Sequence, residues 1–467
     1  METRRQGDRE TTRQGTGFAL FARAPRRLLV SLSPYLLVSS LCAFSRAADW
    51  PQWRGPDRND ISKETGLLKK WPKQGPPLLW TYKNAGTGYS GPAIVGDRLY
   101  SMGARGDAEY VFALDLKDLQ DGSPRELWAV KIGPVFTWDS NNWNRGPSAT
   151  PSVDGDLLFA LGGFGDFVCV ETATGKEVWR KSMTKDLGGA VNNIGGSPET
   201  IGWGYAWSPL VDGEQVVCVP GGSQGMLAAL NKKTGDVIWR SKELPDQATY
   251  SSPIAAEVGG IRQYIQMANR GVAGVDARNG KLLWFYERKP AYNDVVIDTP
   301  IFHDNHVFTT VGFSEGCDLI KLTPDGSAIK ADKVYSNKNM VNRQGGAVLL
   351  DGNLYGYSDN RGWVCLDFKT GKPAWTERRK LNSDGSLTFA DGHLYCYGDK
   401  DGTIVLLDPD PAKWKEDGRS KIPMESVLRK SSGKIWTHPV VANGRLYLRD
   451  QELLFCYDVK EHGQNGH

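Results

Sequence analysis

Short runs of alternating apolar and polar residues recur along most of the chain, separated by tight-turn residues. Each copy begins with a small residue and Pro, passes through an Asp-Gly turn and a second run, and ends in a Gly turn followed by Trp. The clearest copies span Thr150–Trp179, Ser208–Trp239 and Ser252–Trp284. Alternation over about four to eight residues is typical of half-buried strands, and Asp-Gly between two runs favours a two-residue hairpin. The pattern predicts antiparallel strands.

The repeat starts eight times, and its closing strand also occurs eight times. The starts lie at Gly91-Pro92, Thr150-Pro151, Ser208-Pro209, Ser252-Pro253, Thr299-Pro300, Gly346-Ala347, Leu387-Thr388 and His438-Pro439. The closing strands carry Trp80, Trp128, Trp179, Trp239, Trp284, Tyr335, Trp375 and Leu428. Trp80 precedes the first start and the last copy lacks a closing strand, so Pro77–Tyr82 is expected to complete the last unit. Periods of about 40 to 60 residues with four strands each predict an all-β, eight-bladed β-propeller of four-stranded antiparallel blades, closed by an N-terminal strand.

Two positions of the repeat are expected to be structural. The Trp of the closing strand is predicted to pack as a wedge between neighbouring blades. Cys169, Cys365 and Cys456 share a position two residues before an acidic residue, where other blades carry Ala or Gly. Equivalent positions in separate blades are too far apart for a disulfide, so these cysteines are predicted to be buried thiols. The absence of Cys-x-x-Cys argues against a structural zinc site and covalent haem.

The first 47 residues differ in composition from the rest. They hold eight Arg and three acidic residues, whereas the remainder carries 49 basic and 51 acidic side chains. A near-neutral body without a basic run predicts no nucleic-acid partner. Arg26-Arg27, the apolar stretch Leu28–Phe44 and Ser45-Arg46-Ala47 are typical of a cleaved signal peptide. A retained membrane anchor, twin-arginine export and a lipoprotein at Cys42 are alternatives, the last weakened by Leu41.

These features predict the organisation of the chain. A signal peptide covers 1–47, an N-terminal extension 48–77, the propeller 78–460 and a C-terminal tail 461–467. No apolar run after Ala48 approaches the length of a membrane span, so no transmembrane segment is expected after cleavage. The expected location is the periplasm or the medium outside the cell.

Two copies of the repeat carry the motif of a known family. Gly274–Trp284 reads Gly-Val-Asp-Ala-Arg-Asn-Gly-Lys-Leu-Leu-Trp, and Cys365–Trp375 reads Cys-Leu-Asp-Phe-Lys-Thr-Gly-Lys-Pro-Ala-Trp. They resemble the PQQ-repeat propellers, whose blades carry Ala-x-Asp-x-x-Thr-Gly-x-x-x-Trp, and the resemblance covers roughly 78–460. Asp49–Pro56 is also similar to the opening of exported bacterial PQQ-binding-like β-propeller repeat proteins. The resemblance implies the fold more strongly than a function, because the repeat describes blade packing.

The resembled family has two branches with different functions. Quinoprotein alcohol dehydrogenases hold PQQ and Ca²⁺ on the propeller axis, with a disulfide between adjacent cysteines over the quinone and an Asp base. This chain has no Cys-Cys pair, and no motif matches the family's Glu and Asn calcium ligands or its Asp base. The other branch resembles BamB-type outer-membrane assembly scaffolds, which are catalytically silent. Length and lean loops favour this second branch, so no cofactor is expected, with PQQ and Ca²⁺ as the alternative.

Candidate binding residues lie in loops at one face of the predicted ring. The longest inter-blade loops are Lys131–Ser148 and Ser182–Trp207, which combine Trp with Asn. With two arginines of second-to-third-strand loops they give the predicted cofactor-binding residues Trp143, Arg145, Asn193, Trp203, Arg270 and Arg361. Trp together with Asn and Arg suits a planar polar ligand, such as a quinone or a sugar, or an extended peptide. The competing interpretation is that the aromatic residues cover blade edges and the arginines lie on the surface or between blades.

No catalytic or metal-binding residue is predicted. His303 and His306 flank a hairpin turn on opposite faces of the strand path, and His438 at a blade start is expected to be structural. Acidic residues of the inter-blade loops occur singly, at Asp139, Asp186, Glu199 and Asp294. The chain has no Gly-x-Ser-x-Gly, His-Glu-x-x-His or phosphate-loop pattern.

The sequence therefore predicts an exported, non-catalytic PQQ-like β-propeller that acts as a binding or assembly platform in the bacterial envelope. Its partner is expected to be a protein or a glycan, and the oligomeric state is left open. One alternative is an atypical PQQ-dependent quinoprotein oxidoreductase, that is, a dehydrogenase. Another is a glycan-binding propeller. Adjacent cysteines or an identifiable Asp base would favour the enzyme, and the sequence has neither.

Overall fold

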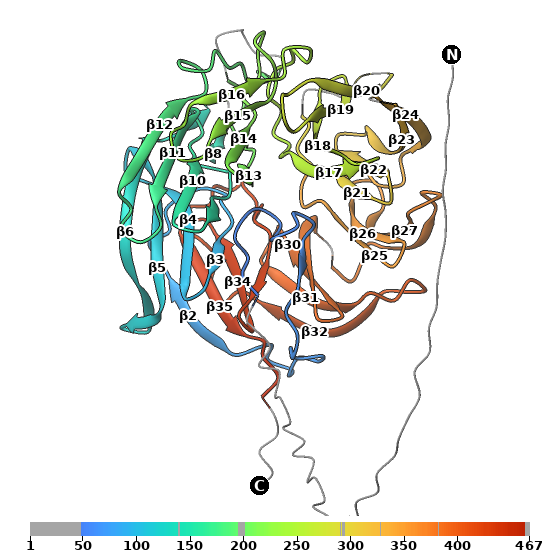
Figure 1. Ribbon diagram of the computed structural model, residues 1–467. Helices are drawn as coiled ribbons and strands as arrows, with labels where there is room; N and C mark the ends of the chain where they lie inside the picture. Colours follow the sequence, from blue (N-terminus) through green and yellow to red (C-terminus); the bar gives the residue numbers. More distant parts are fainter. Residues whose placement is uncertain are drawn as a thin grey trace, which may run out of the picture. The chain divides into compact units, whose positions relative to one another are not determined.

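The computed structural model describes residues 48–138, 141–194, 201–289, 291, 295–326, 328–381 and 383–462, and of residues 141–144 the backbone only. These residues form eight four-stranded antiparallel blades in a ring (Figure 1). The predicted all-β, eight-bladed propeller is therefore confirmed. Within these ranges, no helix has the length and apolar character that crossing a membrane requires.

Seven blades use four consecutive strands each. Blade 1 is β3 (Ala93–Val95), β4 (Arg98–Arg105), β5 (Ala108–Gln120) and β6 (Ser123–Pro134). Blade 2 is β9 (Ser152–Asp154), β10 (Leu157–Leu161), β11 (Asp166–Glu171) and β12 (Glu177–Ser182). Blade 3 is β13 (Leu210–Asp212), β14 (Gln215–Cys218), β15 (Ala228–Asn231) and β16 (Val237–Arg240). Blade 4 is β17 (Ile254–Val258), β18 (Ile261–Ala268), β19 (Gly271–Asp276) and β20 (Leu282–Glu287).

The second half of the ring follows the same order. Blade 5 is β21 (Ile301–His303), β22 (His306–Val311), β23 (Gly316–Asp325) and β24 (Ala328–Asn337). Blade 6 is β25 (Ala347–Leu350), β26 (Asn353–Ser358), β27 (Gly362–Asp367) and β28 (Pro373–Glu377). Blade 7 is β29 (Gly385–Ala390), β30 (His393–Gly398), β31 (Thr403–Asp408) and β32 (Lys415–Lys421). A small hairpin of β7 (Thr137–Trp138) and β8 (Asn141–Arg145) lies between blades 1 and 2.

Blade 8 closes the ring with strands from both ends of the chain. It combines β33 (Val440–Ala442), β34 (Arg445–Asp450) and β35 (Leu453–Asp458) with β2 (Leu78–Tyr82). β2 pairs antiparallel with β35, and Trp80 lies opposite Cys456 and is buried. Blue and red strands are therefore neighbours in Figure 1. Closure by an N-terminal strand is confirmed, and it covers the edge of β35 that would otherwise be open to pairing with another chain.

The Asp-Gly turn of blade 6 adopts the backbone that its residue types favour. Asp351 and Gly352, between β25 and β26, have φ of 46° and 79°. Two consecutive positive φ values are required by a type I′ hairpin turn, which Gly adopts without strain and Asp tolerates. The turn holds Leu350 opposite Asn353 and so fixes the register of the hairpin.

Tryptophans of the outer strands pack between neighbouring blades, as the repeat predicts. Trp179 lies opposite Cys169, and its indole Nε1 donates a hydrogen bond to the Lys232 carbonyl of the next blade at 2.9 Å. A Cβ on Gly235, in the next blade's Thr-Gly turn, would lie 2.9 Å from the indole, so Gly permits this close approach. The same donation to the next blade, at 2.9 to 3.2 Å, is made by Trp128, Trp239 and Trp375.

Blade 7 departs from the repeat and corrects one sequence-based assignment. The residue expected to hold its wedge position was Leu428, but the strand pairing places Gly418 there, opposite Leu406. β32 begins directly after the turn that follows Asp408 and ends at Lys421, so Leu428 lies beyond it in the loop to blade 8. Without a Trp in this strand, the repeat alignment could not predict its register.

Trp71 of the N-terminal extension fills the space that blade 7 leaves open. A Cβ on Gly418 would lie 2.5 Å from the Cβ of Trp71, and the Trp71 N–H donates to the Asp417 carbonyl at 3.0 Å. The Trp71 side chain is 5% exposed, and its ring centroid lies 5.9 Å from that of Tyr395. An aromatic residue from outside the repeat thus packs where the other blades use their own.

Residues 49–64 pack along the inside of the ring, at the face where the turns between the first and second strands of the blades lie. Asp49 accepts a hydrogen bond from the Gly96 N–H of blade 1 at 2.8 Å. Glu64 accepts from the N–H groups of Asn443 and Gly444 in blade 8, each at 2.9 Å. Between these anchors, β1 (Ile61–Ser62) adds parallel to β29. The segment is therefore held at both ends by hairpin turns of the blades.

Two buried arginines fasten this segment to the inner strands. Arg54 and Arg58 are 1% and 4% exposed, and Nε of Arg54 lies 2.5 Å from Oδ2 of Asp60. The Nη atoms of both arginines donate, at 2.6 to 3.2 Å, to carbonyls of blades 3, 5 and 6: Ser208, Pro209, Thr299 and Ala347. Buried guanidinium groups require such partners, so this one segment ties several blades together.

Candidate functional site

Of the two predicted residues of the first long loop, the structure describes the side chain of Arg145. Arg145 of β8 is exposed and donates from Nη2 to the Gly106 carbonyl of blade 1 at 2.9 Å. The side chain of Trp143 lies outside the described part of the chain, as do Asp139, Glu199 and Asp294. Asn193 is half-buried in the loop between blades 2 and 3, where Asp186 accepts the Ser182 N–H at 2.7 Å. Arg145 thus has a structural contact with a neighbouring blade.

Arg270 and Arg361 lie in second-to-third-strand turns of blades 4 and 6. Arg270 is exposed, 3.8 Å from the Asp246 carboxylate, with its guanidinium 5.5 Å from the Phe285 ring centroid. The Arg361 N–H donates to the Ser358 carbonyl at 2.9 Å and closes its turn. Neither residue lines the pocket described next.

An axial pocket of about 410 Å³ opens among the inter-blade loops, within the roughly 300–1,000 Å³ typical of small-molecule sites. Among the predicted binding residues whose side chains the structure describes, Trp203 alone lines it. The walls hold three aromatic pairs, with ring centroids 5.5, 5.1 and 4.4 Å apart: Trp203–Tyr250, Tyr89–Trp436 and Trp53–His438. Phe313 adds a further ring. The pocket therefore has an aromatic lining drawn from loops of many blades.

The N-terminal segment contributes Trp53 and Arg54 to this pocket. The indole Nε1 of Trp53 donates to Oγ1 of Thr299 at 2.9 Å, which fixes the ring. His438, expected to be structural, is buried just before β33, and its Nδ1 lies 3.2 Å from Oδ2 of Asp60. His438 lines the pocket as well as packing, and its ring contacts that of Trp53.

The charged residues at the pocket form compensated groups. Arg343 lies 3.0 Å from the Asp359 carboxylate and 2.7 Å from that of Asp384. Lys434 lies 3.4 Å from Asp399, whose pKa burial raises to about 6 although the lysine opposes the shift. Apart from the buried Arg54–Asp60 pair, these two cations and three carboxylates leave a net charge of −1 when all are ionised. Each cation already has a carboxylate partner.

Two polar side chains at the pocket keep unused hydrogen-bonding capacity. Asp298 is 4% exposed and accepts the Gly346 N–H, but its Oδ2 has no hydrogen-bond partner among the described residues. Burial raises the pKa of Asp298 well above its ordinary value, which favours the neutral carboxylic acid. Within the same ranges, the buried amide nitrogen and oxygen of Gln344 also lack partners. Buried polar atoms normally have partners, so these atoms are available to hydrogen-bond a ligand or water in the pocket.

Sequence analysis missed most of the axial pocket because its residues are scattered over the chain. One local feature could have pointed to it. Blade 6 opens with Gly345-Gly346-Ala347 where four of the eight blades have Ser or Thr before Pro, and Gln344 precedes this departure. A Cβ on Gly345 would lie 2.1 Å from the Gly385 carbonyl oxygen, so the glycine reflects close packing of two blades.

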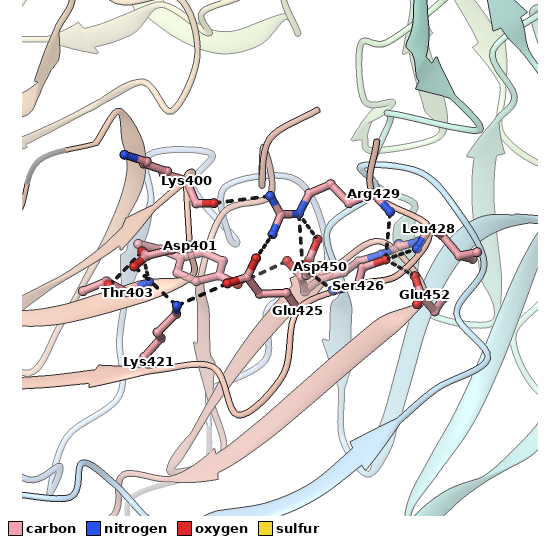
Figure 2. A network of polar contacts seen from close by, with 12 residues as sticks. Lys400, Asp401, Thr403, Lys421, Glu425, Ser426, Leu428, Arg429, Asp450 and Glu452 are labelled. Carbon is pink, nitrogen blue, oxygen red and sulfur yellow. Dashed lines mark hydrogen bonds and ion pairs between the residues drawn. The ribbon is translucent and has the colours of Figure 1, made fainter. Parts of the chain in front are cut away.

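The same face carries an anchored loop, residues 422–439, between β32 and β33. Ser426 N–H donates to the buried carboxylate of Asp450 at 2.8 Å, and Ser426 Oγ accepts from the N–H groups of Leu428 and Arg429 at 3.0 and 3.1 Å. Arg429 also pairs with Asp450 at 3.1 Å and with Glu425 at 2.8 Å (Figure 2). These bonds define the conformation of the turn from both its backbone and its side chains.

The anchored loop displays apolar side chains to solvent. Val427 is 91% exposed, and Leu428 and Met424 are 45% and 41% exposed. Farther along the loop, Lys434 and Trp436 line the axial pocket. A fixed turn that exposes apolar side chains next to a pocket is a suitable contact surface for a partner.

The charges of the axial pocket do not fit PQQ with Ca²⁺. PQQ is a planar quinone with three carboxylates, which bind best to cations that are free to form charge-assisted hydrogen bonds. Arg343 and Lys434 are already compensated, and the surrounding carboxylates would repel the ligand. No group of three or more His, Cys, Asp or Glu in the described ranges is arranged to hold a metal.

Comparison with known proteins gives matches in the repeat region. The family model described as outer membrane protein assembly factor BamB matches residues 115–317 and 327–451, more than half of the chain. The outer membrane protein assembly factor BamB of Shewanella oneidensis is 24% identical over 286 residues, covering 57% of this chain and 67% of that protein. The sequence similarity therefore extends over most of the ring.

Solved structures share the fold. BamB from Moraxella catarrhalis is 13% identical with a TM-score of 0.54, covering 80% of this chain and 96% of that one. Quinohemoprotein alcohol dehydrogenase from Comamonas testosteroni is 12% identical with a TM-score of 0.55, covering 90% and 82%. An assembly factor and a dehydrogenase are thus similar to the same ring, so this likeness indicates fold alone.

Proposed function

We infer the function from family membership: the chain belongs to the family described as outer membrane protein assembly factor BamB. We propose that it is a non-catalytic binding or assembly platform of the bacterial envelope, acting in the periplasm or after secretion. The leader at 1–47, which lies outside the described residues, supports export. The description of the Shewanella relative as an outer membrane assembly factor supports an envelope role.

The observation that carries the proposal is the anchored loop. A turn fixed by the Asp450 carboxylate presents Val427 at 91% exposure, at an energetic disadvantage in water unless a partner covers it. The axial pocket adds support, because its described charged groups compensate one another and none of its described cations is free for an anionic cofactor. We propose a protein partner for the anchored loop, and a glycan partner for this face is the alternative.

The platform role is tested by substituting the anchored loop. Val427→Asp combined with Leu428→Ser places charge and polarity at the contact, and Val237→Asp with Ile238→Ser on the outer strand β16 is the matched control. Partners are crosslinked in envelope preparations of cells that express the protein, identified, purified and titrated against each variant. The loop variant should bind the purified partner at least about tenfold more weakly, while the control binds as the native protein does.

Two results would contradict the platform role. Equal affinity of the loop variant and the native protein for every purified partner would show that the anchored loop is not the contact. PQQ-dependent dye reduction by the purified protein would show that it is an enzyme. Both measurements use the folded protein, so unchanged melting temperatures of the variants are required.

A further inference from the structure

We propose that the axial pocket binds a neutral sugar of one or two rings, which packs on its aromatic walls and hydrogen-bonds to Asp298 and Gln344. This site goes beyond the platform role and does not depend on it, because the exposed residues of the anchored loop, Met424, Val427 and Leu428, do not line the pocket. The inference rests on the pocket's walls, its unused polar atoms and its charges, taken in turn.

The walls suit the faces of a sugar ring. Trp203 and Tyr250 both line the pocket and are stacked, with centroids 5.5 Å apart and planes inclined by 29°, so the pair forms one aromatic wall. Tyr89 and Trp436 form a second pair that also lines the pocket. The C–H groups of a pyranose pack against aromatic faces, while its hydroxyl groups project from the ring edge. Aromatic walls suit the C–H faces of the sugar, and the few polar groups between the walls suit its hydroxyl groups.

The unused polar atoms select hydroxyl groups over charged ligands. A hydroxyl both donates and accepts, so it needs both kinds of partner. The Gln344 amide provides NH₂ donors and a carbonyl acceptor, all without partners within the described ranges. Neutral Asp298 provides an O–H donor at its unpartnered Oδ2. A cation would require acceptors alone and an anion donors alone, so the mixed set favours a neutral polyol.

The charged groups reinforce this selection. Arg343 is shared by Asp359 and Asp384, Lys434 faces Asp399 and Arg54 is paired with Asp60, so among the described lining residues no cation is free for a carboxylate or phosphate ligand. The carboxylates are in turn engaged by those cations, which leaves little attraction for an ammonium ligand. Carboxylates in such pairs can still accept hydrogen bonds from hydroxyl groups, and the cations can still donate to them.

The polar groups are held in place before a ligand arrives. Gly345 and Gly346 have φ of 92° and 63°, and the Gly385 carbonyl packs against the first of them. Arg54 donates to the Ala347 carbonyl at 2.6 Å and so fixes the chain on the other side of this turn. Gln344 therefore stands on a backbone with little freedom, which reduces the entropy lost on binding.

The test uses saturation-transfer NMR and tryptophan fluorescence on the purified full chain. The probes are D-glucose, D-galactose, N-acetyl-D-glucosamine, maltose and cellobiose, with PQQ and tetramethylammonium as the anionic and cationic comparisons. We expect saturable binding of at least one sugar, with neither charged probe competing. Gln344→Leu should weaken sugar binding about tenfold, because the substitution removes the amide and keeps a side chain of similar size. Arg270→Gln, outside the pocket, is the matched control and should bind normally.

A second substitution keeps the test decisive if Gln344→Leu does not fold. Asp298→Asn retains an acceptor for the Gly346 N–H and replaces the O–H donor by an NH₂ donor, so sugar affinity should stay within about threefold. Asp298→Leu should lose it. The proposal is overturned if no sugar of the panel binds, if PQQ or tetramethylammonium binds in the pocket instead, or if the Asp298→Asn variant loses binding. None of these results bears on partner binding by the anchored loop.

Discussion

Trp71 offers a sharp test of how the ring is packed. It lies outside the repeat, yet its side chain takes the position above Gly418 where other blades place their own Trp. Trp71 is 5% exposed and Trp179 is 8% exposed, so both bury nearly their whole side chain. Replacing either by Ala should destabilise the protein by about 3–5 kcal/mol, the usual cost for a large buried aromatic residue.

The two tryptophans differ in one hydrogen bond, so their Phe variants should lose different amounts of stability. Trp179 Nε1 donates to the Lys232 carbonyl at 2.9 Å, whereas Trp71 Nε1 has no partner among the described residues. Trp179→Phe therefore leaves a carbonyl without its donor and should cost about 1–3 kcal/mol more than the lost volume alone. Trp71→Phe removes a buried N–H that was already unpaired, so it should cost clearly less than Trp179→Phe.

Urea denaturation followed by far-ultraviolet circular dichroism measures these differences. The midpoint should shift most for the two Ala variants, less for Trp179→Phe and least for Trp71→Phe, provided that the slope is unchanged. If Trp71→Ala lowers the free energy of unfolding by less than about 1 kcal/mol, its wedge role is wrong. Equal costs for the two Phe variants would contradict the assignment of the Trp179 hydrogen bond.

Three further predictions concern the N-terminal segment and pH. Deleting residues 48–82 should expose the edge of the last blade and cause aggregation, and a deletion variant that stays monomeric with unchanged melting would refute closure. Arg54→Met should lower the free energy of unfolding by about 3–5 kcal/mol, because it leaves buried Asp60 without its guanidinium partner; an unchanged melting temperature would contradict this. Burial raises the pKa of Glu109 to about 7, above its usual value in an unfolded chain, so folding binds a proton between those values. The native protein should therefore lose up to about 3 kcal/mol relative to Glu109→Gln as pH rises to about 7, with no further change above it; parallel stability curves would refute this.

The ring was predictable because the residues that specify each blade lie close together in sequence. Asp-Gly and Thr-Gly turns fix hairpins, and Trp at a constant spacing marks the outer strands, so the closure by Trp80 followed from counting. Blade 7 failed where the spacing failed: Gly418 stands in the Trp position, and the compensating Trp71 is more than 300 residues away in sequence. A contact over that distance has no signature in a single repeat.

The axial pocket was less predictable for a related reason. Repeat positions specify which residues pack within blades, whereas the pocket is lined by the irregular loops between them. Of the predicted binding residues, Trp203 lies in the pocket, and Asp298 and Gln344 were not singled out. Their importance arises from burial without partners, which depends on the folded arrangement of several blades. The repeat alignment predicted aromatic residues in the loops of this face, but it did not predict which of their side chains line the pocket.

The central claim is that this ring binds partners without quinone chemistry, and a PQQ titration tests it most directly. The purified protein is titrated with PQQ in the presence and absence of Ca²⁺, and binding is read by the absorbance of the quinone and by the melting temperature. Dye reduction with alcohols and sugars is measured in the same samples. The account predicts no saturable spectral change, no shift in melting temperature and no dye reduction. Saturable PQQ binding that raises the melting temperature and supports dye reduction, and that disappears in an Arg343→Gln variant, would contradict it.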